Sequence, residues 1–157
     1  MYYFIAILAA VIFDQAVKFA IRTNMDLHSS IAVIDGIFHI TYIQNTGAAF
    51  SILSGHTYGL IMITLLITAG ILTYLYKLRK SGHWLLMSSL SLIVAGGIGN
   101  IIDRLMLGYV VDFFDLRVWP IFNVADVYVC TGCVLLILYV FVIEPKLNEK
   151  KDYKNVQ

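Results

Sequence analysis

Two aspartates, Asp112 and Asp126, have the residue type and the setting that acid–base chemistry on a peptide bond requires. Asp112 follows a pair of valines, and Asp126 lies three residues after Asn123. Two carboxylates that converge cannot both ionise cheaply, so they share one proton near neutral pH. The ionised carboxylate can take a proton from water, while the protonated one stabilises the oxyanion and helps the amine to leave. The pair therefore predicts an aspartic peptidase.

The segment from Asn123 to Asp126 also has a purely structural interpretation. An asparagine at the start of a helix caps free backbone N–H groups, and an acidic residue three positions later completes that pattern. Both interpretations stay open on the sequence. Because the N-terminus of a helix favours negative charge on Asp126, we expect Asp112 to hold the shared proton, although a coupled pair titrates as a unit.

Asp14 and Lys18 interrupt the first apolar stretch of the chain. An ionisable residue inside a membrane span is costly unless it is paired or faces a wet cavity, so each one is a functional candidate. The two residues are four positions apart and share a helix face. A mutual ion pair that lowers the cost of insertion is therefore the structural alternative.

A second polar face lies in the third apolar stretch, where Asn100, Asp103 and Arg104 are spaced by three and four residues. These residues share one side of a helix and are candidates for a site. The small residues just before them would let another helix approach closely; they are Ala95, Gly96, Gly97 and Gly99. Packing by these glycines, with Arg104 as an interfacial anchor, is the structural alternative.

Cys130 and Cys133 form a C-x-x-C pattern, which in other settings indicates redox chemistry. Because they lie inside an apolar stretch, we expect the two thiols to pack as small apolar groups. Zinc would need further cysteine or histidine ligands, and all four histidines lie outside the apolar stretches. We therefore expect no metal and no cofactor. A thiol oxidoreductase, or a transporter with a proton site at Asp14 or Asp103, are the rival functions.

The composition indicates where these residues are held. Of the 157 residues, 60% are hydrophobic and only 13% are charged, and the mean hydropathy is +0.83. A soluble domain of this size needs a more polar surface, so the chain is predicted to be a membrane protein. A net charge of +1 is too balanced to indicate a nucleic-acid partner. The length predicts a single domain over residues 1–157, which we expect to be monomeric.

Four stretches are long enough to cross the hydrocarbon core as helices, which takes about 20 apolar residues. They lie at about 2–22, 57–77, 84–107 and 124–143. A different segment, about 31–50, is rich in β-forming residues and is divided by Asp35-Gly36, a strong hairpin signal. The predicted fold is therefore an all-α integral membrane protein with four transmembrane helices and a small extracytoplasmic β element between the first two. We expect a short helical turn at 48–53.

Basic residues predict the orientation of these helices in the membrane. They follow the second helix and fill the C-terminal tail; these residues are Lys77, Arg79, Lys80, Lys146, Lys150, Lys151 and Lys154. Cytoplasmic segments carry this excess, so both termini are expected in the cytoplasm and the aspartate pair at the extracytoplasmic face. Lys18 and Arg22 run against this trend, but long basic side chains can snorkel to the interface.

Five blocks of residues, in this order, resemble the bacterial lipoprotein signal peptidases, also called signal peptidase II. The blocks are Asp14-Gln15-x-x-Lys18, Asn45-Thr46-Gly47-Ala48-Ala49-Phe50, Gly99-Asn100-x-x-Asp103-Arg104, Val110-Val111-Asp112-Phe113 and Phe122-Asn123-x-Ala125-Asp126. They span most of the chain, and as an ordered set they are highly specific. Little precedes the first helix in this chain, a departure from the family pattern that leaves the orientation to the other loops.

The resemblance implies an aspartic endopeptidase of the bacterial cytoplasmic membrane that removes signal peptides from prolipoproteins. It would cut before a cysteine that carries a diacylglyceryl group, with Asp112 and Asp126 as the catalytic residues. The other matching positions would support the site or bind substrate; they are Asp14, Lys18, Asn45, Gly47, Asn100, Asp103, Arg104 and Asn123. The implied partners are lipid-modified prolipoproteins and membrane lipids, and no cofactor is implied.

Overall fold

Most of the protein is helical, and a small sheet completes the fold. The computed structural model describes residues 2–47 and 57–155. The elements in chain order are α1 (Tyr2–Asn24), β1 (Ser30–Ile34), β2 (Phe38–Asn45), α2 (Thr57–Leu78), α3 (Trp84–Leu107), β3 (Val110–Asp115), α4 (Val124–Leu138) and α5 (Glu144–Asn155). The helical turn expected at 48–53 lies outside the described residues.

Four helices in the described part of the chain are long and apolar enough to cross a membrane. These spans are Tyr2–Asn24, Tyr58–Leu78, Trp84–Leu107 and Val124–Glu149. The predicted fold class, a multi-pass membrane protein with a small β element, is confirmed. In α3, 67% of the apolar window of the span is buried inside the protein, whereas this share is 22% or less in each of the other three spans. α3 is therefore the central helix.

The helix that contains the fourth span continues past its apolar stretch. After α4 the chain makes one π-helical turn, Tyr139–Ile143, and passes directly into α5. Glu144 keeps right-handed helical angles at this junction, so the helix is not interrupted. The apolar length of this segment therefore indicates which part can cross a membrane, but not where the helix ends.

The sheet has the strand order β1-β2-β3, and both pairs are antiparallel. Asp35-Gly36 forms the predicted turn between β1 and β2, where Gly36 adopts a φ of +69° and the Ile37 N–H donates to the Ile34 carbonyl at 3.0 Å. β3 was not predicted. Its sequence pairs apolar residues instead of alternating them with polar ones, so it carries no period-two signal.

The glycines of α3 serve close packing, as one interpretation of the sequence predicted. A Cβ at Gly96 would collide with the carbonyl oxygen of Ala125 in α4. A Cβ at Gly99 would lie 2.5 Å from Asp14 Oδ2 of α1. Because neither position has room for a side chain, α1 and α4 come close enough to α3 for their polar groups to meet.

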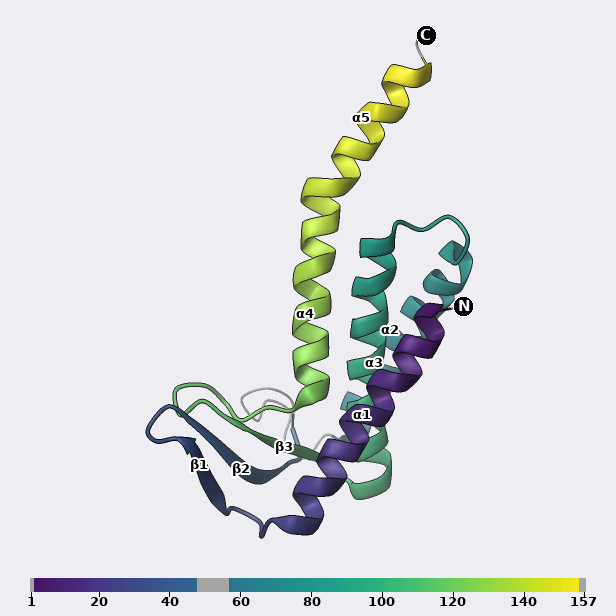
Figure 1. The fold of residues 1–157 in the computed structure, drawn as a ribbon. Coiled ribbons are helices and arrows are strands. Elements are labelled where there is room, and N and C mark those ends of the chain that lie inside the picture. Colours follow the sequence, from purple (N-terminus) through teal and green to yellow (C-terminus); the bar gives the residue numbers. More distant parts are fainter. Residues whose placement is uncertain (1, 48–56, 156–157) are drawn as a thin grey trace.

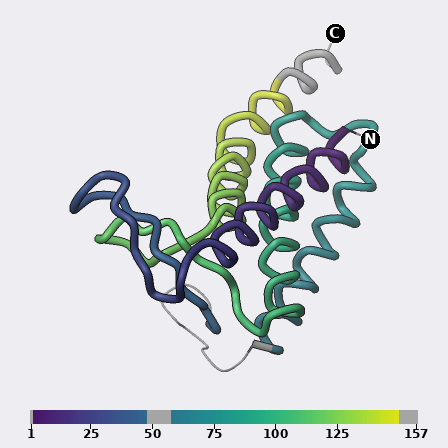
Figure 2. The backbone as a smooth tube through the Cα atoms, turned by 60° about the horizontal axis from the view of Figure 1, so that its bottom comes forward, coloured from purple at the N-terminus to yellow at the C-terminus, as the bar shows by residue number. Residues whose placement is uncertain are grey.

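The sheet lies across one end of the helix bundle, and the start of α1 and the whole of α5 lie toward the opposite end (Figure 1). The β1–β2 hairpin projects to one side of the helices, which is visible in both views (Figure 2). β3 follows α3 directly and leads through a loop to α4. The end of α3, the strand β3 and the start of α4 therefore meet at the sheet end of the bundle.

Candidate active site

Asp112 and Asp126 come from two different elements that meet at this end. Asp112 lies on β3, where successive side chains point to opposite faces. Its neighbours Val111 and Phe113 pack in an apolar cluster with residues of α1. Asp112 therefore points to the other face, and its exposed fraction is only 1%. Asp126 is partly buried in the first turn of α4.

Asn123, directly before α4, binds both carboxylates. Its side-chain Nδ2 donates to Asp112 Oδ1 at 2.6 Å, and its backbone N–H donates to Asp126 Oδ2 at 3.1 Å. The Asp126 N–H donates back to Asn123 Oδ1 at 3.0 Å and completes a capping box. The capping interpretation is thus confirmed, and it does not compete with a chemical role, because the cap fixes the Asp126 carboxylate beside Asp112.

Two further amides complete the set of donors. Asn45 Nδ2 donates to Asp112 Oδ2 at 2.8 Å, and Asn100 Nδ2 of α3 donates to Asp126 Oδ1 at 2.9 Å. The sheet register explains the first contact: Ile43 is paired with Asp112, and Asn45, two residues further along β2, points to the same face. All four carboxylate oxygens of the pair therefore accept a hydrogen bond from a neutral donor.

Burial, together with the nearby charge of Asp126, raises the pKa of Asp112 to about 7. The amide donors Asn45 and Asn123 and the charge of Lys18 act in the opposite direction. A pKa near neutrality means that Asp112 exchanges its proton at physiological pH. Asp126 lies at a helix N-terminus, where the helix dipole favours negative charge.

The pair faces a cleft of about 970 Å³. Its polar wall carries Asn45, Asn100 and Arg104 beside the two aspartates. Its apolar wall comes largely from the loop between β3 and α4, with Leu116, Trp119, Pro120, Ile121 and Phe122. Convergent polar groups at one wall of a largely apolar cleft are typical of a binding or catalytic site.

Arg104 and Gly47 connect α3 to the end of β2. The Nη2 of Arg104 donates to the Gly47 carbonyl at 2.9 Å. The Gly47 N–H donates to Asn45 Oδ1, also at 2.9 Å. Within residues 2–47 and 57–155, the Nε of Arg104 is buried without a hydrogen-bond partner. Arg104 is thus a lining residue of the cleft whose Nε is buried behind the cleft surface.

Asp14, Lys18 and Asp103 form a second charged cluster, which we call the ion triad. Lys18 Nζ lies 3.0 Å from Asp14 Oδ2 and 3.2 Å from Asp103 Oδ2. The predicted Asp14–Lys18 pair is confirmed, whereas Asp103 as its third member was not predicted. The exposed fraction of each residue is 2% or less, and the residues that line the cleft do not include any of the three.

The expectation that Cys130 and Cys133 pack as small apolar groups is wrong, because both are exposed on α4. The packed residue of this turn is Gly132, where an added Cβ would lie 2.7 Å from the Ser89 carbonyl of α3. The flanking cysteines therefore point away from α3. Cys130 lines the cleft one helical turn beyond Asp126.

Sequence reasoning missed two contributors to this region. Gln15 was not a candidate, yet its Nε2 donates to Asp103 Oδ1 at 2.9 Å and to the Gly99 carbonyl at 3.1 Å. The sequence feature that could have identified Gln15 is a polar amide next to Asp14 within an apolar helix. The apolar wall around Trp119 was also missed, because a loop of mixed apolar residues has no periodicity that would indicate which way its side chains point.

The chain is similar to known proteins over most of its length. The family model for signal peptidase (SPase) II matches residues 6–142. The lipoprotein signal peptidase of Halothermothrix orenii is 46% identical over 138 residues, which cover 88% of this chain and 94% of the relative. That of Streptococcus thermophilus is 48% identical over 136 residues, with coverages of 85% and 88%.

A solved structure gives the same result for the fold. It is described as a bacterial membrane enzyme and aligns with a TM-score of 0.81 at 35% sequence identity, covering 88% of this chain and 87% of its own. Sequence and fold thus agree over the region that contains the aspartate pair, the ion triad and the cleft. The chain belongs to the signal peptidase II family.

Proposed function

We propose that the protein removes signal peptides from prolipoproteins, with Asp112 and Asp126 as the catalytic pair of an aspartic peptidase. One observation carries the proposal: Asn123 holds both carboxylates at the wall of one cleft, and all four carboxylate oxygens accept neutral donors. Neutral donors orient two carboxylates without cancelling their mutual repulsion, which favours a shared proton. Membership of the signal peptidase II family supports the same reaction.

The two aspartates have different roles in this mechanism. Asp126, whose negative charge the helix N-terminus favours, takes a proton from a water molecule, and that water attacks the carbonyl carbon of the scissile peptide bond. Asp112, with its pKa raised to about 7, carries the shared proton and donates a hydrogen bond to the oxyanion. When the C–N bond breaks, the amine leaves with a proton from the pair, and the pair returns to its starting state.

Arg104 and Asn45 would orient the peptide. Arg104 lines the cleft, and a guanidinium group carries five N–H donors, so a terminal N–H that is not bound to Gly47 or Asn100 can donate to a backbone carbonyl of the substrate. Its contact with the Gly47 carbonyl fixes the guanidinium against the end of β2. Asn45 is bound to both Asp112 and Gly47, so it links the position of the catalytic carboxylate to this edge of the cleft.

The substrate class follows from the setting of the cleft. The relatives are lipoprotein signal peptidases, and we propose that this protein likewise acts on prolipoproteins, before a cysteine that carries a diacylglyceryl group. A substrate anchored by lipid diffuses in the bilayer, and the cleft lies where the membrane helices end and the sheet begins. Its apolar wall around Trp119 suits the lipid-modified residue, and its polar wall suits the peptide backbone.

We further propose that this end of the bundle faces away from the cytoplasm and that both termini are cytoplasmic. The positive-inside distribution of Lys and Arg supports this orientation. The start of α1 and the whole of α5 lie toward the end opposite the sheet, consistent with two termini on one side (Figure 1). A reporter fused to the C-terminus and active only in the cytoplasm tests this orientation, which a reporter active only outside would contradict.

The function is tested with purified protein in lipid vesicles. A diacylglyceryl-modified prolipoprotein should be cleaved before its modified cysteine, and its unlipidated precursor should not. Asp112→Asn and Asp126→Asn should each reduce kcat by about three orders of magnitude or more, because either amide removes the shared proton. Asp115→Asn is the matched control, since Asp115 is also buried on β3 but bonds to Thr41 and Arg117.

Two results would contradict the proposal. Near-normal cleavage by either variant of the pair would remove that aspartate from the chemistry. Equal cleavage of lipidated and unlipidated precursors would contradict the proposed substrate.

A further inference from the structure

We propose that Lys18 is a positioning residue: through the ion triad it holds β3 and α4 at the separation that the two catalytic aspartates need. The inference rests on the proposed function of Asp112 and Asp126. Sequence reasoning gave Lys18 an ion pair with Asp14 and, through the family resemblance, a place among the residues that would support the site or bind substrate. Its contacts in the structure specify how it would support the site.

Lys18 uses all three of its donors within the protein. Its Nζ lies 3.0 Å from Asp14 Oδ2 in its own helix, 3.2 Å from Asp103 Oδ2 in α3 and 2.9 Å from Asn100 Oδ1 in α3. Its exposed fraction is 2%. An ammonium group has no more than three N–H donors, so Lys18 is fully committed to these contacts.

Each carboxylate of the ion triad also holds a backbone N–H group directly before a catalytic aspartate. Asp14 Oδ1 accepts the N–H of Ala125, one residue before Asp126, at 2.9 Å. Asp103 Oδ2 accepts the N–H of Val111, one residue before Asp112, at 3.0 Å. Because Lys18 binds both carboxylates, it connects the backbone of α4 with that of β3.

A third connection runs through the side chain of Asn100. Its Oδ1 accepts from Lys18 and, at 3.2 Å, from Asn123 Nδ2. An amide whose oxygen is held in this way must turn its NH2 group elsewhere, and Asn100 Nδ2 donates to Asp126 Oδ1. Lys18 thereby selects the amide orientation that supplies a donor to Asp126.

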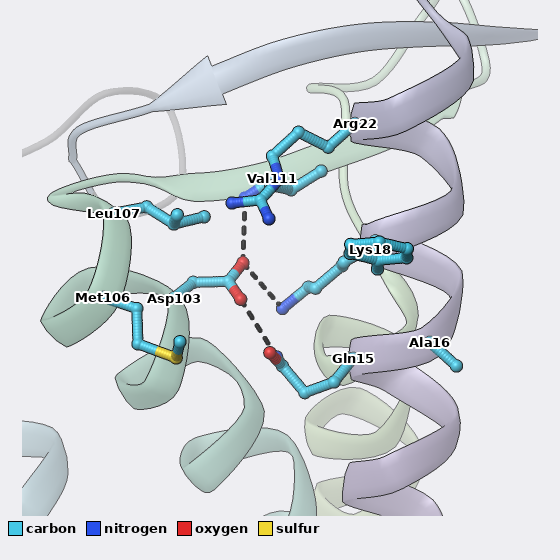
Figure 3. Close-up of a pocket in the computed structure, with 9 residues that line it drawn as sticks. Gln15, Ala16, Lys18, Arg22, Asp103, Met106, Leu107 and Val111 are labelled. Carbon is cyan, nitrogen blue, oxygen red and sulfur yellow. Dashed lines mark hydrogen bonds and ion pairs between the residues drawn. The ribbon is translucent and has the colours of Figure 1, made fainter.

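The ion triad acts from behind the catalytic pair, away from the substrate. Lys18 and Asp103 line a smaller cavity of about 360 Å³ on the α1 side, together with Gln15 and Val111. Figure 3 shows the Asp103 carboxylate at the centre of this cavity, with contacts to Lys18, Gln15 and Val111. Asn100, which Lys18 binds, lines the catalytic cleft instead. The triad therefore reaches the reacting groups through hydrogen bonds and does not touch the substrate.

Stability alone does not account for this arrangement. Two buried carboxylates around one lysine leave a net negative charge, and a buried ion cluster is often no more stable than apolar residues of the same volume. Its directional contacts do specify where the backbone before each catalytic aspartate lies. A misplacement of about 1 Å in a reacting group can reduce the rate about 100-fold.

The test compares Lys18→Met with the charge-balanced double variant Lys18→Met/Asp103→Asn. The single variant leaves two buried carboxylates unpaired and can fail to insert, whereas the double variant restores the net charge of the triad. The asparagine in the double variant also keeps an oxygen that can accept the Val111 N–H. We expect the double variant to insert and melt like the wild type, with kcat about 100-fold lower and KM within about threefold.

Leu75→Ala is the matched structural control, because Leu75 is fully buried in the helix core outside the site. It should lower the Tm while kcat and the pH profile stay unchanged. In Lys18→Met the basic limb of the kcat/KM profile should move to higher pH, since the charge of Lys18 lowers the pKa of Asp112. Two charged residues face Lys18, namely Asp14 and Asp103. The charged residues near Asp112, besides Lys18 itself, are Asp126 and Arg104.

Wild-type kcat in the double variant would overturn the inference, because Lys18 would then only balance buried charge. A fall in kcat that follows the Tm, as a general loss of folding would produce, would overturn it as well. These failures of the inference differ from a failure of the proposed function. If the proposed function were wrong, Asp112→Asn or Asp126→Asn, with Lys18 intact, would cleave normally.

Discussion

Two pairs of aspartates lie on either side of Asn100, and they differ in the group that joins them. Asp14 and Asp103 share the ammonium group of Lys18. Asp112 and Asp126 share Asn123, a neutral amide. The cation compensates the charge of the first pair, whereas the amide orients the second pair and leaves its repulsion in place. Under the proposed function, the same residue type therefore serves structure in one cluster and acid–base chemistry in the other.

Burial does not separate Asp112 from Asp14 and Asp103, but access to the larger cleft does. The exposed fractions of Asp14, Asp103 and Asp112 are 0%, 2% and 1%. Only Asp112 and Asp126 line the 970 Å³ cleft. A carboxylate that faces this cleft and accepts hydrogen bonds from neutral amides can exchange a proton with substrate and water, whereas Asp14 and Asp103 are paired with Lys18 and lie outside the cleft. If the proposed assignment holds, the counter-charge of an aspartate and its access to the cleft together are better guides to catalysis than its burial.

The largest expected effect concerns the pair itself. Asp112→Asn and Asp126→Asn should each reduce kcat by roughly 1,000-fold or more, and the double variant should be little worse than either single one, because residues that act as a unit are not additive. Single-turnover cleavage of a lipid-modified precursor measures these rates. If the losses of the single variants multiply in the double variant, the two carboxylates act independently.

A smaller effect is expected at the amide that joins the pair. Asn123→Ala removes the donor to Asp112 and the cap of α4. We expect kcat to fall about 100-fold and the free energy of unfolding to fall by about 2 kcal/mol. Activity and thermal unfolding of the same preparation measure both. A loss of stability without a loss of kcat would restrict Asn123 to helix capping.

The packing beside the ion triad should affect stability more than chemistry. Gly99→Ala would bring a Cβ within 2.5 Å of Asp14 Oδ2, so we expect it to cost about 1–3 kcal/mol. Gly70→Ala in α2 is the control, since a Cβ there has no neighbour within 4 Å. Thermal unfolding in detergent compares the two variants. Equal stability would mean that α1 and α3 can separate without cost.

The smallest effect is expected at the thiols. Cys130→Ala/Cys133→Ala should leave kcat within about threefold of the wild type, because both side chains are exposed and neither contributes a donor to the pair. Cys130 lines the cleft, so a modest change in KM is expected. Abolished cleavage in this variant would favour thiol chemistry over the aspartate pair.

The fold class could be predicted from the sequence because membrane spans require long apolar stretches, and the hairpin could be predicted because Asp35-Gly36 accepts its turn geometry. The strand β3 could not, since its pairing with β2 depends on residues far away in the sequence. The same limit applied to Asp103, which was recognised as a polar residue in a span. That it shares Lys18 with Asp14 follows only from the packing of α1 against α3.

The sequence predicted which two aspartates meet in the candidate site, but not the hydrogen bonds that hold them. Topology brings the end of α3 and the start of α4 to one face, so Asp112 and Asp126 could be paired before the structure was known. The contacts through which Asn45, Asn100 and Asn123 hold them could not be predicted, because amide orientation depends on the partners of each side chain. Cys130 and Cys133 illustrate the same point, since Gly132 between them takes the packed position.

The central claim, a catalytic pair that shares one proton with Asp112 as its main holder, is tested most directly by kcat/KM as a function of pH. Below its raised pKa Asp112 keeps its proton, and above that pKa the proton is lost, so activity should fall as the pH rises through about 7. A second ionisation should reduce activity on the acid side, when the pair takes up a second proton. The predicted result is a bell-shaped profile whose basic limb lies near pH 7. Activity that stays constant or rises up to about pH 9 would contradict the shared proton and with it the assignment of the pair.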